Sequence, residues 1–223
     1  MTSTSRAKVA SAARTFGRLV LLSAVAASPV ILAAMVHANP GAPVPDADHE
    51  AAMFGDPVAA APYWRRQHGS DCGELAVADV VGQLTGREPT EQQMIALAET
   101  TPSATGHGPI WKPTGSTDIA DLPVLLWRYW IRADNIQSDA VALTRKLGEN
   151  HKVIAIVNAE TIWNRPGKRN SANHFVVVTG IDSKAGVVHL NDSGIDTGRD
   201  EQISLVTFER AWAPNYNSAI VTK

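Results

Sequence analysis

One cysteine in this sequence stands where a reactive thiol is expected. Cys72 is the only cysteine among the 223 residues, and the apolar run at residues 75–81 directly after it predicts a buried helix. Free backbone N–H groups and the positive dipole end at a helix N-terminus favour a thiolate, which is the nucleophilic form of cysteine. Cys72 is therefore a candidate nucleophile, with a buried structural cysteine as the alternative.

A thiol that attacks an amide needs a general base, and that base needs an acceptor to orient it. His174 begins a predicted strand beside the Gly- and Pro-containing loop 163–173, and Asp192 follows the end of the next predicted strand. If the two strands form a hairpin, the start of the first lies beside the end of the second, and the two side chains are neighbours. Asn191 is a rival orienting residue. Because side chains alternate along a strand, only one of Asn191 and Asp192 can face His174.

Three segments together resemble a known family. They are residues 67–73, residues 174–180 and residues 188–192. In this order and with these strand contexts, they resemble the bacteriocin-processing peptidases that cleave double-glycine leaders, members of the papain-like cysteine peptidase clan. The resemblance is greatest to the stand-alone exported domains similar to these enzymes, and it covers about residues 63–222.

The resemblance implies a role for each of four side chains. Cys72 would be the nucleophile, His174 the general base, Asp192 the orienting carboxylate and Gln67 a donor to the oxyanion. The chain departs from the family pattern in two places: the step from Gln67 to Cys72 is one residue shorter than usual, and Ser193 replaces the proline that usually follows the aspartate.

The elements that would position these residues fall into two halves. Helical patterns dominate the first half, and apolar runs typical of buried strands dominate the second, which predicts an α+β fold with an antiparallel sheet. The predicted helices cover residues 72–84, 94–98 after a capping box at 90–93, 118–131, 138–147 and 207–212, and the predicted strands cover residues 153–157, 175–179, 186–191, 203–206 and 218–222.

The N-terminal part of the chain predicts export. Residues 1–38 combine four basic residues, no acid, an apolar segment at 19–36 and small residues before position 39. This pattern is typical of a signal peptide, with an uncleaved membrane anchor as the alternative. Residues 39–62 are rich in Pro and Ala and predict a linker, so the peptidase-like domain would span 63–223. The expected location is outside the cytoplasm, secreted or in the cell envelope.

Charge and composition limit which classes of partner are expected. Beyond residue 38, 16 basic and 22 acidic residues give a net charge of −6, so nucleic acid is not an expected partner. A single cysteine and scattered histidines provide no metal-ligand spacing, and no cofactor is expected. The expected partner is a peptide or protein substrate, with contact to a membrane only if the N-terminal segment is retained. A non-catalytic binding domain on the same scaffold and a thiol acyltransferase remain as alternatives to hydrolysis.

Two side-chain patterns lie outside this site. The basic residues Arg165, Lys168 and Arg169 follow one another in the loop before His174, where they would either contact an acidic substrate segment or be solvated. Three aromatic residues between positions 127 and 130 lie on a predicted helix and are expected to pack in the core.

Overall fold

The computed structural model describes residues 52–106, 108–113 and 115–223, which combine helices with one seven-stranded sheet. The strand order is β2-β7-β3-β4-β5-β6, β1 pairs with β4, and every pairing is antiparallel. The predicted α+β class with an antiparallel sheet is confirmed. The strands are β1 (Met53–Gly55), β2 (Ala133–Gln137), β3 (Val153–Val157), β4 (His174–Asp182), β5 (Val187–Asn191), β6 (Glu201–Ser204) and β7 (Ser218–Thr222).

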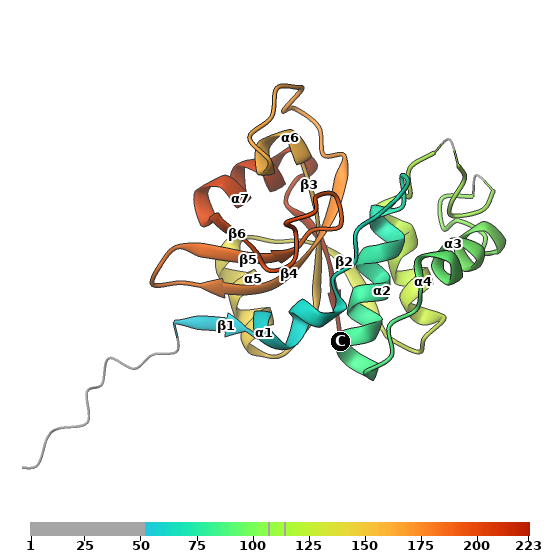
Figure 1. The fold of residues 1–223 in the computed structure, drawn as a ribbon, viewed down its shortest axis with the longest axis horizontal. Helices are drawn as coiled ribbons and strands as arrows, with labels where there is room; N and C mark the ends of the chain where they lie inside the picture. The colour runs from blue at the N-terminus through green and yellow to red at the C-terminus, as the bar shows by residue number, and fades with distance from the viewer. Residues whose placement is uncertain (1–51, 107, 114) are drawn as a thin grey trace, which may run out of the picture. The chain divides into compact units, whose positions relative to one another are not determined.

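Helices cover both faces of this sheet (Figure 1). Alternation along β3 and β4 sends Ile154 and Val177 to one apolar cluster, and Val153 and Val176 to the other. The first cluster includes α2 (Cys72–Thr85), α3 (Glu91–Thr100) and α4 (Leu122–Trp127), and the second includes α5 (Ala140–Gly148), α6 (Ala159–Ile162) and α7 (Leu205–Trp212). Both faces of the central strands are therefore buried, as their continuous apolar sequences indicate.

Helix α2 carries the cysteine and lies directly against the sheet. It begins at Cys72, as predicted, and ends where Gly86 adopts a left-handed conformation with a φ of 72°. A Cβ atom at Gly73 would lie 3.1 Å from Leu122 and 3.3 Å from Phe175. Glycine at this position thus lets the first turn of α2 approach β4 closely, next to His174.

The predicted hairpin between the second and third predicted strands is present as β4 and β5. Val177 pairs with Asn191, Val178 pairs with Leu190, and the register shifts between Val178 and Gly180. Strand β4 is longer than predicted, because it continues past residue 179 to pair with β1 as well as with β5. The start of β4 and the end of β5 lie at the same edge of the fold.

The predicted linker 39–62 is wrong for its last residues, since folded structure begins before residue 63. Strand β1 pairs with β4, α1 (Pro57–Ala60) follows with Asp56 capping it, and a 3-10 turn covers Ala61–Tyr63. Prolines at the first positions of these short helices are compatible with helix starts, not only with linkers. The rest of the linker and the predicted signal peptide lie in residues 1–51, outside the described residues. In the described part of the chain, no helix is long and apolar enough to span a bilayer.

Two other predicted elements end at earlier residues than predicted. The predicted helix 118–131 stops at Trp127 in α4, and Trp130 has a φ of 62° where the chain turns into the unpredicted strand β2. Trp127 and Trp130 are exposed instead of packed in the core. The strand predicted at 203–206 ends at Ser204, because the Ser204 side chain accepts the backbone N–H of Thr207 and starts α7 there.

Candidate active site

The start of β4 and the end of β5 bring a histidine and an aspartate together. His174 Nε2 lies 2.6 Å from Asp192 Oδ1, and the two residues are 4% and 0% exposed. Asn191 points elsewhere: its amide donates to Asp79 Oδ2 at 2.7 Å and to the Ala60 carbonyl at 3.0 Å. The structure thus places Asp192, and not Asn191, beside His174, as strand alternation requires of one of them.

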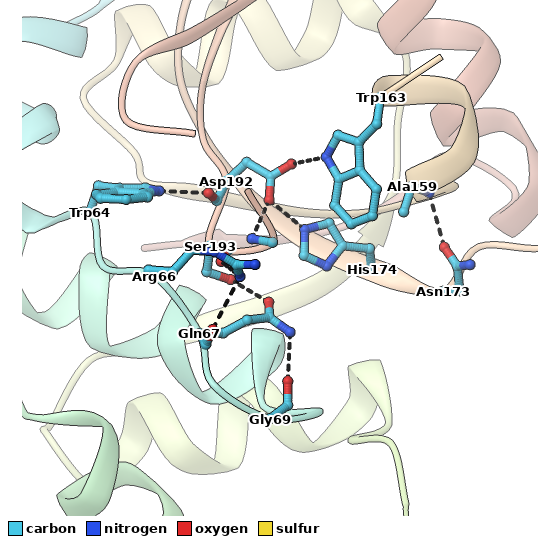
Figure 2. A network of polar contacts seen from close by, with 11 residues as sticks. Trp64, Arg66, Gln67, Gly69, Ala159, Trp163, Asn173, His174, Asp192 and Ser193 are labelled. Atoms are coloured by element: carbon cyan, nitrogen blue, oxygen red, sulfur yellow. Dashed lines mark hydrogen bonds and ion pairs between the residues drawn. The ribbon is translucent and has the colours of Figure 1, made fainter. Parts of the chain in front are cut away.

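Further donors hold the Asp192 carboxylate in place (Figure 2). Trp163 Nε1 donates to Oδ2 at 2.8 Å, and the Gly194 backbone N–H donates to Oδ1 at 2.6 Å. Burial alone would raise the pKa of Asp192, but the hydrogen bonds and the charge of His174, helped by Trp163 and Gly194, lower it. Asp192 is therefore a fixed carboxylate that accepts a hydrogen bond from His174.

Cys72 lies on the same cavity as the imidazole of His174 and influences its pKa. Burial acts to lower the pKa of His174, but hydrogen bonds and charge from Asp192 and Cys72 outweigh it and raise this pKa to about 10. Because Nε2 is bound to Asp192, Nδ1 is the ring nitrogen left for Cys72. A positively charged imidazole next to the sulfur favours the thiolate form of cysteine.

Gln67 lies in the same cavity as Cys72, but its amide is engaged on both sides. Its Nε2 donates to the Gly69 carbonyl at 2.7 Å, and its Oε1 accepts the Ser193 hydroxyl at 2.8 Å. The Gln67 backbone N–H also donates to the Ser193 carbonyl at 3.0 Å. Ser193, which replaces the usual proline, thus orients Gln67 from the same turn that carries Asp192 (Figure 2).

The thiol of Cys72 and the imidazole of His174 line a cavity of about 370 Å³. Cys72 and His174 lie on its wall, between the loop before α2 on one side and α6 with the segment before β4 on the other. Among the residues that line it are Gly69, Gly115, Ala159 and Ala172, whose small side chains leave the space open. This cavity gives the sulfur access to a ligand, so Cys72 is not a buried structural cysteine.

Two acids next to the site were not found from the sequence. Glu201 on β6 has a buried oxygen, Oε2, that has no hydrogen-bond partner among the described residues. Burial, followed by the charge of Asp192, raises the pKa of Glu201 to about 8. Asp71, directly before Cys72, is fully buried, and burial together with Glu91 raises its pKa to about 6. Near pH 7, Glu201 is mainly neutral and leaves Asp192 as the charged partner of His174.

Trp163 is a further contact of the site that the sequence did not single out. Its indole donates to Asp192, and its ring lies 5.2 Å from that of His174, centroid to centroid. A Cβ atom at position 194 would lie 2.4 Å from this ring, so Gly194 makes room for it. The only signal in the sequence is the place of Trp163 at the start of the loop that leads to His174.

No group in the described residues is arranged as a metal site. Within residues 52–106, 108–113 and 115–223, no three His, Cys, Asp or Glu side chains are arranged to hold a metal ion. The chemistry of this site therefore has to be argued from the cysteine, the histidine and their supporting groups.

The cysteine lies at the start of a buried helix, and the histidine lies on the sheet at the same cavity. This arrangement defines the papain-like class of cysteine peptidase folds. The chain belongs to the Peptidase_C39 like family, whose model matches residues 47–220. The resemblance to bacteriocin-processing peptidases noted in the sequence is thereby confirmed at the level of the family.

The chain is also similar to individual proteins and solved structures. Uncharacterized proteins of Mycobacterium tuberculosis and Mycobacterium bovis are 43% identical over 195 residues, which cover 76% of this chain and 84% of theirs. The crystal structure of a protein from Bacillus anthracis assigned as a C39-like peptidase has a TM-score of 0.55 at 18% identity, over 74% of this chain and 96% of that one. A double glycine motif protease of a transporter, crystallised with its leader peptide, has a TM-score of 0.46 at 17% identity, over 71% of this chain and 88% of that one.

Proposed function

We propose that this protein is an exported cysteine peptidase that hydrolyses a peptide bond through Cys72, His174 and Asp192. The observation that carries the proposal is the buried His174–Asp192 hydrogen bond of 2.6 Å, combined with the position of His174 and Cys72 on the wall of one open cavity. Membership of a peptidase family and the peptidase fold support the same reaction class.

The first half of the reaction forms a thioester. The Cys72 thiolate attacks the carbonyl carbon of the peptide bond, and a C–S bond forms while the carbonyl oxygen takes the electron pair. As the C–N bond breaks, His174 gives its Nδ1 proton to the departing nitrogen, which leaves as a free amine. Asp192 stays ionised throughout and holds the imidazole in the orientation that reaches the sulfur.

The second half releases the product. His174, now neutral, takes a proton from a water molecule, and the resulting hydroxide attacks the thioester carbon. The C–S bond breaks, the thiolate returns to Cys72 beside a protonated His174, and the peptide leaves as a carboxylic acid, which gives its proton to the solvent. The reaction consumes one water molecule and leaves the enzyme unchanged.

We infer two donors for the oxyanion. Cys72 is the first residue of α2, so its backbone N–H has no acceptor within the helix. Gln67 Nε2 carries two hydrogens and donates one to Gly69, which leaves the other for the oxyanion. The hydrogen bond from Ser193 to Gln67 Oε1 fixes which end of the amide faces the cavity.

The exported location is part of the proposal and rests on residues 1–38 alone. Their basic start and apolar segment are those of a signal peptide or an anchor. A fusion of residues 1–38 to a reporter that works only outside the cytoplasm tests this point, and a reporter that stays inactive would contradict it.

The enzymatic proposal is tested with the full chain and a mixture of peptides, followed by mass spectrometry. The wild type should cleave at defined bonds and be labelled by a thiol-directed electrophile, and Cys72→Ala should do neither. Full hydrolysis by Cys72→Ala would refute the proposal. Products in which the acyl group is joined to an added amine would indicate an acyltransferase. A wild type that neither cleaves nor transfers, and whose thiol reacts slowly whether or not His174 is present, would indicate a binding domain.

A further inference from the structure

We propose that a second cavity, next to α6 and α7, binds a small anionic ligand with carboxylate or phosphate groups. This anion cavity has a volume of about 730 Å³ and is lined by residues of α6, the following loop, β6 and α7, among them Arg169, Ser204, Thr207 and Arg210. None of these residues lines the cavity that holds Cys72. The proposal is therefore independent of the peptidase reaction.

Helix α7 and its N-cap residue Ser204 present a row of polar side chains to this cavity. Ser204, Thr207 and Arg210 are spaced three residues apart and lie on one side of the helix. The opposite side is anchored in the core by Phe208 and Trp212, which are fully buried. The polar row is thus held on a rigid element, as a binding site requires.

The hydroxyl groups of the row have donor capacity to spare. Ser204 Oγ and Thr207 Oγ1 lie 2.8 Å apart, so one of the two hydroxyls donates to the other. Whichever of them donates, the second hydroxyl keeps its proton for another acceptor. An anionic oxygen in the cavity would satisfy that donor.

The two arginines give the wall of the cavity a positive charge. No acidic residue is among the described residues that line it, and Arg210 makes no hydrogen bond or ion pair with a described side chain or backbone group. Glu209 is the neighbour of Arg210 in sequence but lies on a different side of α7 and does not line the cavity. The Arg210 guanidinium is free to bind a ligand.

The guanidinium of Arg169 is held by a hydrogen bond within its own loop. Its Nη2 donates to the Arg165 carbonyl at 3.0 Å, which leaves its other N–H groups available. The guanidinium of Arg165 itself stacks on Trp163, 5.0 Å from the ring centroid. The charge of Arg169 helps to lower the pKa of Glu160. The Glu160 carboxylate, however, accepts hydrogen bonds from Asn158 and Asn173 and lines the active-site cavity.

This arrangement matches the chemistry of anions better than that of other ligands. Guanidinium groups bind carboxylate and phosphate oxygens through paired, charge-assisted hydrogen bonds. Ile162 and Ile203 add apolar surface to the cavity, which suits the carbon skeleton of an organic acid or phosphate ester. The positive charge is also local, because the chain beyond residue 38 has a net charge of −6.

Isothermal titration calorimetry tests the proposal with inorganic phosphate, pyrophosphate and citrate at low ionic strength. The full chain carries Cys72→Ala, so that the result does not depend on peptidase activity. We expect saturable binding of at least one probe. Arg210→Ala and Arg169→Ala should each weaken it about tenfold or more, since each removes a charge-assisted contact.

Arg145→Ala is the matched control, because Arg145 is also an exposed arginine in the last turn of an amphipathic helix, α5, but does not line the cavity. Binding that Arg145→Ala leaves unchanged and the two cavity variants weaken supports the proposal, and the relative affinities of phosphate and citrate distinguish the two sources of charge. No saturable binding of any probe to the folded protein, or an equal loss in Arg145→Ala, would overturn it. Thermal unfolding of each variant verifies that it is folded.

Discussion

The described residues include two histidine–aspartate pairs, both with their histidine on the β4–β5 hairpin and with nearly equal distances between the paired atoms. His174 and Asp192 lie 2.6 Å apart, and His189 and Asp200 lie 2.7 Å apart. The first pair uses Nε2 and the second uses Nδ1. Distance alone therefore does not distinguish the proposed catalytic pair from the other.

The surroundings of the two pairs differ sharply. The side chains of His174 and Asp192 are 4% and 0% exposed, whereas those of His189 and Asp200 are 11% and 32% exposed. Asp192 accepts additional hydrogen bonds from Trp163 and Gly194, and His174 lines an open cavity together with Cys72. A histidine becomes a candidate base when its partner is fixed and desolvated and a nucleophile lies on its other side.

The largest effect should come from the two histidines. His174→Ala should lower kcat/KM by roughly 10²- to 10⁴-fold, because it removes the proton donor and acceptor of the reaction. His189→Ala should leave kcat/KM close to that of the wild type. Steady-state kinetics on a peptide cleaved by the wild type measures both, and equal losses in the two variants would break the comparison.

The two aspartates should show the same contrast as the two histidines, with a large loss of activity at Asp192 and none at Asp200. Asp192→Asn should lower kcat by roughly 10²- to 10⁴-fold, because an amide cannot balance a protonated His174 or hold it in the same tautomer. Asp200→Asn tests whether any His–Asp hydrogen bond is needed, and it should leave kcat and its pH profile intact. An Asp192→Asn enzyme with the wild-type pH profile would contradict the assigned role of Asp192.

The support of Asp192 by Trp163 should have a smaller effect. Trp163→Phe keeps the ring but removes the hydrogen bond of 2.8 Å to Asp192, and we expect kcat to fall about tenfold, with a change in its pH profile. Trp212→Phe is the control, since Trp212 also donates from its indole, to the Ser218 carbonyl, but within the core. That variant should lose stability and keep its kcat, so a parallel loss of kcat in both would indicate a merely structural role for Trp163.

The comparison extends to stability through Asp79, a buried acid whose hydrogen-bond partners carry no positive charge. Burial raises the pKa of Asp79 to about 7, against hydrogen bonds from Gln83 and Asn191. Because the folded-state pKa lies above the unfolded value, the stabilisation is complete below about pH 4 and is lost as pH rises through about 7.

Asp79→Asn should therefore flatten the fall in the free energy of unfolding between pH 5 and pH 8 by at most about 1.4 kcal/mol per pH unit. Urea unfolding at several pH values measures this. The control is Asp134→Asn, whose side chain is 54% exposed and which should leave the slope unchanged. An equal slope in the wild type and Asp79→Asn would show that Asp79 is ionised in the folded protein.

The parts of the site that depend on local sequence could be predicted. The apolar run after Cys72 specified α2, and the two apolar runs with a short turn between them specified the β4–β5 hairpin. That His174 and Asp192 lie next to each other follows from this hairpin, and the structure contains both the hairpin and the contact. These features depend on periodicity and turn chemistry within a few residues, which a sequence displays directly.

The features that were missed depend on contacts between distant segments. Strand β1 exists because Phe54 and its neighbours pair with the far end of β4, and Pro57 in this region looked like part of a linker. The direction of the Trp163 indole and the burial of Glu201 depend on how β5, β6 and α6 pack together. The sequence also left open whether Asn191 or Asp192 faces His174, because either phase of the strand was compatible with its pattern.

The most direct test of the account is the rate at which iodoacetamide alkylates Cys72 between pH 5 and pH 9. The account predicts that a thiolate paired with protonated His174 reacts rapidly even near pH 6, and that His174→Ala, but not His189→Ala, slows this reaction about tenfold or more. Equal rates near pH 6 in the wild type and in folded His174→Ala would contradict it.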